Sequence, residues 1–297
     1  MSRRGAGTRA GQAALALTAA LALGAAPVPA TYRASVEAWR AEREAKLRAE
    51  DGWLAVAGLF WLRQGANSLG TLPGNDIVLP AGSAPARAGT LTLRDGRVML
   101  RLARGVTAAG AGHSPEREIA PDGDEVVALG RLRLSVIERS GRHGLRVRDP
   151  ESPRRRGFSG LAWYPVDESF RVAARFVPAA QRTIGVANVL GDVLEMPSPG
   201  QVEFTLRGRA LRLDPALEVG SPRLFFIFRD TTAGRDTYPA GRYLYAEPPA
   251  DGVVTLDFNR AYSPPCAFTD FATCPLPPPQ NRLSVAVEAG EKKPPHP

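Results

Sequence analysis

The chain has 297 residues, of which 44% are hydrophobic and 23% are charged, and its formal net charge is +8. This length allows one large or two ordinary domains with real cores. The positive charge is modest and favours solubility, and it is not the signature of a nucleic-acid-binding protein. The one tight basic run, Arg154-Arg155-Arg156, also has no neighbouring aromatic side chains on which bases could stack.

The N-terminus has the pattern of a secretory signal peptide. Three arginines precede the apolar stretch Ala13–Ala26, and Val28-Pro29-Ala30 forms a small-x-small cleavage site. The apolar stretch is shorter than the roughly 20 residues that a membrane-spanning helix needs. We therefore expect residues 1–30 to be removed, and the protein to be exported to the periplasm or the extracellular space without an integral membrane segment.

One amphipathic helix is expected over residues 31–52. Its apolar residues recur at the spacing of a helix, Arg43 interrupts the apolar stripe, and Asp51-Gly52 ends the pattern. A helix that precedes a sheet-rich body commonly packs across that body and closes one end of it.

Short strands separated by turns follow over residues 53–150. Asp95-Gly96 lies between two alternating segments and predicts a two-residue hairpin turn. The pattern predicts a small antiparallel β-sandwich that ends near Pro150. The residues around 149–157 are polar and basic, and they predict a linker.

The second half, residues 151–291, is predicted to be a larger antiparallel β-sandwich or open barrel, so that the fold class is mostly β. The last residues, 292–297, are expected to be a frayed tail. The strands expected in this half include Arg171–Phe176, Arg182–Val189, Gly200–Leu206, Arg223–Phe228, Gly241–Tyr245, Val253–Asn259 and Leu283–Ala289.

The segment Asp257–Glu291 is rich in proline and has little regular pattern. Proline removes a backbone donor, so the segment cannot form a regular helix or a central strand. Long irregular segments are functional or disordered, and the aromatic residues here favour an ordered functional loop. Its two cysteines, Cys266 and Cys274, are expected to form a disulfide in an exported protein. A pair of free buried thiols and a reactive thiol with a resolving partner are the alternatives.

Several blocks of the sequence resemble a bacterial family called "domain of unknown function 1684". This resemblance implies no established activity. Ser263 departs from the asparagine that the family pattern has before the paired prolines. The blocks that carry the resemblance are Gly58-Leu59-Phe60-Trp61-Leu62, Phe158–Pro165, Asp230–Gly234, Thr237–Leu244 and Asp257–Glu291.

The first strand region also looks like a degenerate forkhead-associated domain. Asn67-Ser68-Leu69-Gly70 followed by Asn75–Pro80 and a hairpin has the order of such a sandwich. Thr71 stands where the phosphothreonine-reading members have an arginine. Without that arginine, phosphopeptide binding loses its physical basis, and we interpret this half as a scaffold.

Standard catalytic and metal-binding motifs do not occur in the sequence. The three histidines, His113, His143 and His296, are not spaced as a metal pair, and there is no CxxC, P-loop or dinucleotide fingerprint. We therefore expect no metal and no cofactor.

A cluster of polar residues in the last third supplies the candidate site. Arginines offer planar forks for carboxylates or phosphates, and tyrosine and asparagine can orient a polar ligand. The ligand-binding candidates are Asp230, Thr231, Arg235, Tyr238, Arg242, Tyr245, Asn259, Arg260, Tyr262, Asn281 and Glu291.

Three functions remain open at this point. The leading one is binding of a small polar or anionic molecule in a pocket beside residues 257–291. The first alternative is a hydrolase in the same pocket, with Asp257 or Glu288 as general base and Arg242 or Arg260 holding the substrate. The second is a protein-interaction module of the cell envelope, in which the first sandwich binds a partner and the polar cluster is only structural.

Overall fold

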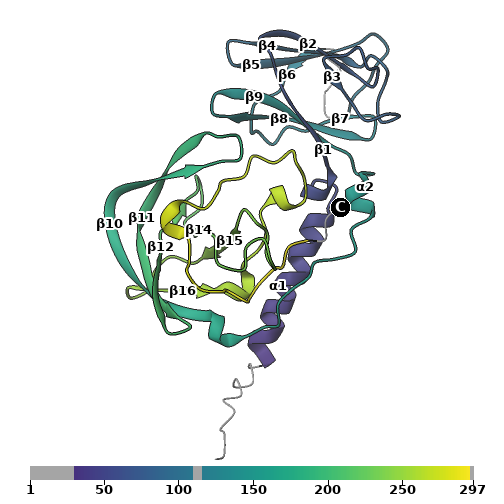
Figure 1. Cartoon of the computed structure of the whole chain (residues 1–297). Coiled ribbons are helices and arrows are strands. Elements are labelled where there is room, and N and C mark those ends of the chain that lie inside the picture. The colour runs from purple at the N-terminus through teal and green to yellow at the C-terminus, as the bar shows by residue number, and fades with distance from the viewer. Residues whose placement is uncertain (1–29, 110–115, 295–297) are drawn as a thin grey trace, which may run out of the picture.

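The computed structural model describes residues 30–109 and 116–294, and it shows one long helix and two β domains (Figure 1). The fold is mostly β, as the sequence predicted. The expected signal peptide, residues 1–30, lies outside the described residues except for Ala30, and so does half of the expected tail, residues 295–297.

The long helix α1 spans Ala30–Arg48 and runs beside the C-terminal domain toward the N-terminal domain (Figure 1). Val36 and Leu47 are its buried residues, and Leu47 packs with Leu54 and Phe268. The helix ends four residues before the predicted boundary at residue 52. The backbone N–H of Gly52 donates to Ala49 O at 3.0 Å, which closes the turn after the helix.

The N-terminal domain, residues 53–150, is a sandwich of two sheets with strand orders β3-β2-β4-β5-β6 and β1-β9-β8-β7. Its core lies between the sheets and consists of leucine, valine and isoleucine side chains. A 3-10 helix, η1 (Trp53–Ala55), precedes the strands. The strands are β1 (Val56–Trp61), β2 (Gly65–Gly70), β3 (Ile77–Val78), β4 (Gly89–Arg94), β5 (Arg97–Leu102), β6 (Glu116–Glu118), β7 (Val127–Leu129), β8 (Leu132–Arg139) and β9 (Arg142–Arg148).

The predicted hairpin at Asp95-Gly96 is confirmed. β4 and β5 pair antiparallel up to Arg94 and Arg97. Both turn residues have positive φ angles, 51° at Asp95 and 76° at Gly96. Such angles match the twist of the flanking strands, and Asp-Gly adopts them readily.

The predicted linker carries the short helix α2 (Pro153–Arg156), and η2 (Glu168–Phe170) leads into the second domain. Two antiparallel sheets form that domain, with orders β12-β11-β10-β16 and β13-β14-β15, and they do not close into a barrel. Further 3-10 helices are η3 (Phe258–Arg260), η4 (Pro265–Ala267) and η5 (Pro279–Asn281). The strands are β10 (Arg171–Ala187), β11 (Val193–Leu206), β12 (Arg209–Leu213), β13 (Ala216–Leu217), β14 (Leu224–Phe228), β15 (Arg242–Ala246) and β16 (Val253–Asp257).

Two of the predicted strands are one strand in the structure. The segments expected at Arg171–Phe176 and Arg182–Val189 belong to β10, and β11 begins seven residues before the predicted Gly200. The register of β10 with β11 shifts between Pro178 and Arg182. The irregularity at Pro178 is why the sequence pattern is interrupted there, since proline cannot donate to the ladder.

The prediction of a final strand at Leu283–Ala289 is wrong. Alternate residues of this segment are buried in the domain core, as the period of a strand requires. Its backbone pairs with a neighbouring backbone only at its start, where Leu283 N–H donates to Arg229 O at 2.7 Å and Val285 O accepts from Thr231 N–H at 3.2 Å, and side chains hold the rest. Arg242 donates to the carbonyls of Val287 and Ala289, and Val287 N–H donates to Asp230 Oδ1 at 3.3 Å.

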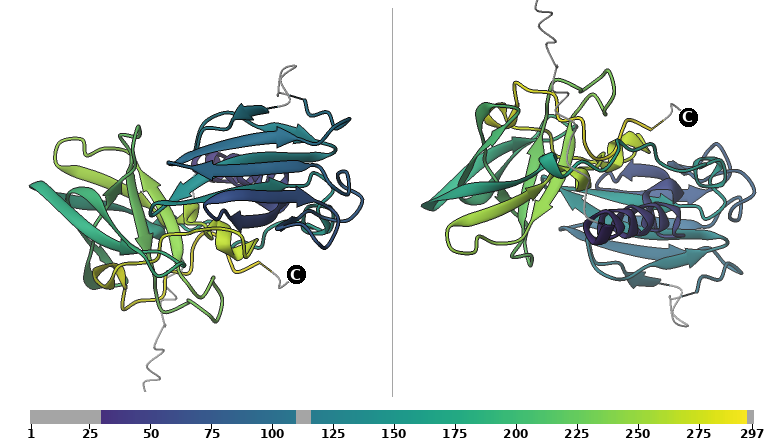
Figure 2. Two further views of the ribbon diagram at one scale, coloured as in Figure 1. Left: turned by 90° about the horizontal axis from the view of Figure 1, so that it is seen from above. Right: turned by 90° about the horizontal axis from the view of Figure 1, so that it is seen from below.

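The two β domains are offset from each other, and α1 lies on the same side of the molecule as the N-terminal domain when the chain is seen from above or below (Figure 2). Arg142 of β9 forms an ion pair with Asp192 at 2.8 Å, which links the domains at one edge. No helix among residues 30–109 and 116–294 is long and apolar enough to cross a membrane.

Candidate functional site

A pocket of about 800 Å³ lies between α1 and the C-terminal domain. The start of β10, the end of β15, β16 and η3 form its other walls. The residues that line it are Tyr32, Ser35, Trp39, Glu42, Arg43, Lys46, Arg171, Arg223, Tyr245, Ala246, Glu247, Pro248, Ala250, Val253, Thr255, Asp257, Arg260 and Tyr262.

Aromatic rings form one wall of the pocket. Tyr245 and Tyr262 lie nearly parallel, with ring centroids 6.4 Å apart, and Tyr245 stacks on Phe225 at 4.8 Å. The Arg43 guanidinium covers the Tyr262 ring at 4.6 Å, and Arg223 covers Tyr245 at the same distance. Burial raises the pKa of Tyr262 to about 12, so its phenol is neutral at physiological pH. The wall offers flat apolar faces edged by cations.

Asp257 anchors α1 to the C-terminal domain. Its Oδ1 accepts from the Tyr32 hydroxyl at 2.7 Å and from the Asn259 backbone N–H at 3.2 Å, and its Oδ2 lies 3.3 Å from Arg260 Nε. The Asn259 amide is fully buried and donates to Tyr32 Oη at 3.0 Å. Asp257 therefore holds the pocket together through the hydrogen bonds of Oδ1 and the ion pair of Oδ2.

Positively charged side chains outnumber negatively charged ones among the residues that line the pocket. Its three carboxylates are each paired: Glu42 with Lys46 at 2.6 Å, Glu247 with Arg223 at 3.4 Å, and Asp257 with Arg260. Arg171 has no carboxylate partner among the described residues, and its guanidinium lies 5.2 Å from the Tyr32 ring. The pocket therefore carries a net positive charge with Arg171 at its edge.

Glu291 is completely buried behind the pocket. Its Oε2 lies 3.4 Å from Arg43 Nε, and within the described part of the chain its Oε1 has no hydrogen-bond partner. Burial raises the pKa of the Glu291 carboxyl above its usual range, although Arg43 and Ser263 partly oppose this shift. Arg43 also donates to Ser263 O at 2.9 Å and so joins the pocket wall to residues 257–291.

Replacing Glu291 with glutamine should change how stability depends on pH. An acid whose folded-state pKa is raised binds its proton more tightly in the folded chain, so stability falls as pH rises from the unfolded pKa of about 4.3 through the folded pKa. We expect the stability of Glu291→Gln relative to wild type to increase with pH over that range. Urea unfolding at a series of pH values measures this, with the exposed Glu288→Gln as the matched control. A difference for Glu291→Gln that stays constant with pH would contradict the assignment.

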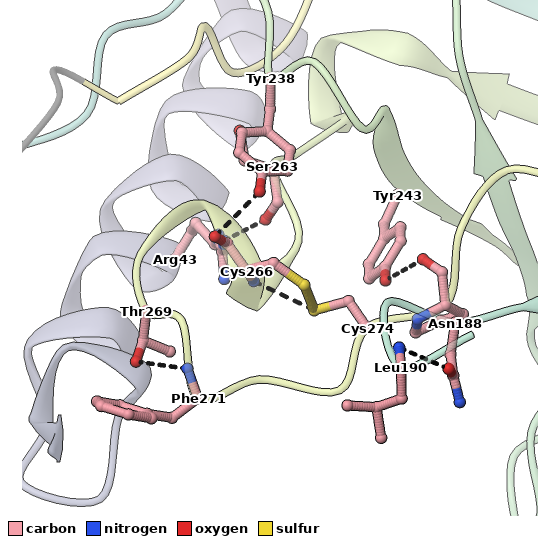
Figure 3. Close-up of a disulfide and its surroundings, with 11 residues drawn as sticks. Arg43, Asn188, Leu190, Tyr238, Tyr243, Ser263, Cys266, Thr269, Phe271 and Cys274 are labelled. Atoms are coloured by element: carbon pink, nitrogen blue, oxygen red, sulfur yellow. Dashed lines mark hydrogen bonds between the residues drawn. A yellow bond between two sulfur atoms is a disulfide. The ribbon is translucent and has the colours of Figure 1, made fainter. Parts of the chain in front are cut away.

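The disulfide Cys266–Cys274 stabilises the loop beside the pocket (Figure 3). The Tyr238 hydroxyl donates to Cys266 O at 3.0 Å, and the Tyr243 hydroxyl donates to Pro275 O at 2.8 Å. The loop is thus tied to β15 next to Cys274 and to the connection between β14 and β15 at Cys266, and the expected pairing of the cysteines is the one in the structure. Tyr238, a predicted ligand-binding residue, has this role in the structure.

Four of the sequence-predicted site residues line the pocket: Tyr245, Asp257, Arg260 and Tyr262. Asn259 and Glu291 lie directly behind it, as described above. The sequence analysis missed the contributions of α1 and of Arg171 and Arg223. The one signal for α1 was Arg43, which interrupts an otherwise apolar stripe and points to a polar function on that face of the helix.

Another group of predicted residues lies elsewhere. Asp230 and Arg242 form an ion pair of 2.7 Å inside the protein core, with exposed fractions of 6% and 1%. Asn281 is buried and bridges two backbone groups. Its side-chain oxygen accepts from Asp214 N–H at 2.8 Å, and its side-chain amide donates to Ile227 O at 3.0 Å. Among the described residues, these three line neither the pocket beside α1 nor a hollow over β11 and β12.

Three further candidates are on the surface. Thr231 and Arg235 are exposed. Arg235 pairs with Asp236 at 2.6 Å and lies 4.0 Å from Glu288. Glu288 does not line the pocket that holds Asp257, so the two proposed general bases do not converge.

A second, shallower hollow of about 760 Å³ lies over β11, β12 and residues 279–284. It is lined by polar side chains and the edge of the sheet, and it contains none of the predicted ligand-binding residues. In the described part of the chain, no group of three or more histidine, cysteine, aspartate or glutamate side chains is arranged to hold a metal ion.

Comparison with known proteins gives a family but no activity. Residues 156–292 match the family described as "Protein of unknown function (DUF1684)". The chain is similar to an uncharacterized protein of Haloarcula marismortui whose solution NMR structure is known, with 36% sequence identity over 48% of this chain and 82% of that chain and a TM-score of 0.40. No curated protein matches the chain.

Proposed function

The chain belongs to the DUF1684 family of proteins of unknown function, and from this premise we propose that it binds a small anionic molecule in the pocket between α1 and the C-terminal domain. The observation that carries the proposal is the charge balance of the pocket. All three of its carboxylates are paired within the protein, whereas Arg171 has no acidic partner among the described residues.

The pocket also suits a ligand with a ring. Tyr245 and Tyr262 present flat faces, and pockets of 300–1,000 Å³ with aromatic walls and a few polar groups are typical of small-molecule sites. An arginine can hold a carboxylate or phosphate in a bidentate geometry. A sugar acid, a sugar phosphate or an aromatic carboxylate would combine these features.

Binding is favoured over hydrolysis by the state of the carboxylates. A general base needs an oxygen that can accept the proton of a substrate or a water. Asp257 Oδ1 accepts hydrogen bonds from Tyr32 and Asn259, its Oδ2 is ion-paired with Arg260, and Glu288 is outside the pocket. The geometry therefore supports a binding protein.

We also propose that the protein acts outside the cytoplasm. The expected signal peptide supports this proposal, and so does the disulfide Cys266–Cys274, because disulfides persist mainly in oxidising compartments. Expression with the natural N-terminus, followed by cell fractionation and N-terminal sequencing of the product, tests it. Recovery of a chain that begins at Thr31 outside the cytoplasm is expected, and an uncleaved cytoplasmic chain would contradict it.

A thermal-shift panel tests the proposed pocket. Uronic acids, sugar phosphates, aromatic carboxylates and neutral sugars are screened against wild type, Arg171→Met and Tyr245→Leu. A ligand at 100 times its Kd stabilises the folded state by about 2.7 kcal/mol. We expect one anionic class to raise the Tm of wild type, with at least a roughly tenfold weaker Kd in Arg171→Met, since hydrogen bonds to charged groups are worth about 1.5–3 kcal/mol.

Arg209→Met is the matched control, because Arg209 is an exposed arginine of the same domain that does not line the pocket. Its ligand-dependent shift should equal that of wild type. If neutral sugars shift the wild-type Tm as strongly as the acids do, or if Arg171→Met keeps the full shift, the anionic pocket is not the binding site.

A further inference from the structure

Three arginines lie side by side on one face of the N-terminal sandwich. In the antiparallel pairing of β8 with β9, Arg133 is opposite Arg148 and Ser135 is opposite Arg146. Leu145 and Val147 of β9 point into the sandwich core. Because side chains alternate along a strand, Arg146 and Arg148 point to the other face of the sheet.

This face is turned toward the C-terminal domain (Figure 1). The ion pair Arg142–Asp192 crosses between the domains at one edge of the sheet, and Thr269 Oγ1 lies 3.5 Å from Val56 O on β1. The Arg146 guanidinium lies 5.0 Å from the ring of Trp53, which also packs against side chains of the C-terminal domain. The arginines are therefore at the junction of the two domains.

Arg146 is buried without the partners that a buried guanidinium needs. Its exposed fraction is 6%, and its Nε and Nη2 have no hydrogen-bond partner. Arg148 Nε is likewise unpartnered, and its Nη1 is only 3.4 Å from Ser135 Oγ. Arg133 reaches two backbone carbonyls of its own turn, at 3.3 and 3.4 Å.

Among residues 30–109 and 116–294, no carboxylate is directly paired with these arginines, although Asp122 acts on Arg146 and Asp51 acts on Arg148 from a distance. Asp122 is itself bound by Arg139 at 2.8 Å. Burial, reinforced by the neighbouring charge of Arg148, lowers the pKa of Arg146 to about 10.

A buried and unpaired cation is costly to a folded protein, and buried charges are normally paired. Adjacent like charges on neighbouring strands add to that cost. A phosphate group carries about −1.5 to −2 charges at pH 7 and has several strong acceptor oxygens, so it would match this cluster better than a single carboxylate.

We propose that Arg146 and Arg148, with Arg133 beside them, form a phosphate-binding site at the junction of the two domains. This site is separate from the pocket beside α1. Its occupant is a phosphate group, free or carried by a small molecule, held by the guanidinium N–H groups that have no other acceptor.

Isothermal titration of the whole mature chain with inorganic phosphate, in a buffer whose ionic strength is matched with chloride, tests the site. We expect one binding event in wild type, and a Kd raised at least about tenfold in Arg146→Met and in Arg148→Met, since each removes charge-assisted hydrogen bonds. Arg146→Met keeps an apolar stem of similar length and should raise the Tm of the phosphate-free protein. In saturating phosphate, the Tm of wild type should rise by at least this difference.

Two control variants distinguish binding at this site from binding elsewhere on the protein. Arg94→Met removes an exposed arginine of the same domain and should bind phosphate as wild type does. Arg171→Met should also bind phosphate normally; if it is the variant that loses binding, phosphate occupies the pocket beside α1 and this proposal is wrong. Absence of phosphate binding to wild type would equally overturn it, and it would leave the proposed pocket for other anions unaffected. Comparing inorganic phosphate with glucose 6-phosphate distinguishes a free ion from a phosphate ester.

Discussion

Replacing Arg242 with methionine is expected to lower the free energy of unfolding by about 3–5 kcal/mol, the usual cost of removing one partner of a buried ion pair. Arg242 is 1% exposed, and its Nη2 donates to Asp230 at 2.7 Å and to Val287 O at 2.8 Å. The variant would leave the buried Asp230 carboxylate without its cation. It would also leave the carbonyls of Val287 and Ala289 without their donor.

Urea unfolding of Arg242→Met and of the double variant Asp230→Asn/Arg242→Met measures the two parts of this loss. Asparagine keeps an oxygen for the N–H of Thr232 and of Val287 but carries no charge. The double variant should therefore recover part of the stability that the single variant loses. If both variants lose the same amount, the cost comes from the unpaired carbonyls and not from the stranded charge.

Replacing Gly290 with alanine should destabilise the protein by about 3 kcal/mol, the sum of two costs. The φ angle of Gly290 is +79°, in the left-handed region where an L-residue loses about 1–2 kcal/mol. An added Cβ would also lie 2.7 Å from Phe258 O and closer still to Ala261 O. Relieving this overlap requires backbone movement, which costs a further 1–3 kcal/mol or so.

Gly252→Ala is the matched control for this change. Gly252 has a nearly identical φ of +75°, but no atom lies within 4 Å of the position of its Cβ. It should lose only the cost of the left-handed conformation, about 1–2 kcal/mol. Thermal and urea unfolding of the two variants give the comparison, and equal losses would show that the contact with the η3 backbone is not tight.

The sequence predicted local structure well where a local rule decides it. The Asp95-Gly96 hairpin follows from turn residues that adopt positive φ, and the mostly β fold follows from strands of alternating pattern. Leu283–Ala289 has the same alternation, and its apolar side chains are buried as predicted. Whether such a segment becomes a strand depends on a continuous neighbouring backbone. Here residues 229–231 pair only with its first half, and Arg242 binds the carbonyls of Val287 and Ala289 in the second half. No local pattern contains that information.

The candidate site was predicted in part. Tyr245, Asp257, Arg260 and Tyr262 line the pocket because β15, β16 and η3 converge there. Asp230 and Arg242 have the same residue types as Asp257 and Arg260 but pair with each other in the core, and composition cannot distinguish the two cases. The whole helical wall was missed, since contacts such as that of Arg43 with Tyr262 join parts of the chain that are distant in sequence.

The pocket is formed by α1, at the start of the described chain, and by residues of the C-terminal domain. The order of synthesis therefore determines when the pocket can form. The hydrogen bond from Tyr32 to Asp257 spans 225 positions. At a synthesis rate of about 5–20 residues per second, α1 exists for roughly 11–45 s before its partner is translated. During that interval, the face of Trp39 that later packs on Tyr262 has no docking surface. Closing this contact is a late event that must await the C-terminal segment, so a chain interrupted before residue 257 would retain the residues of the N-terminal sandwich but could not assemble the pocket.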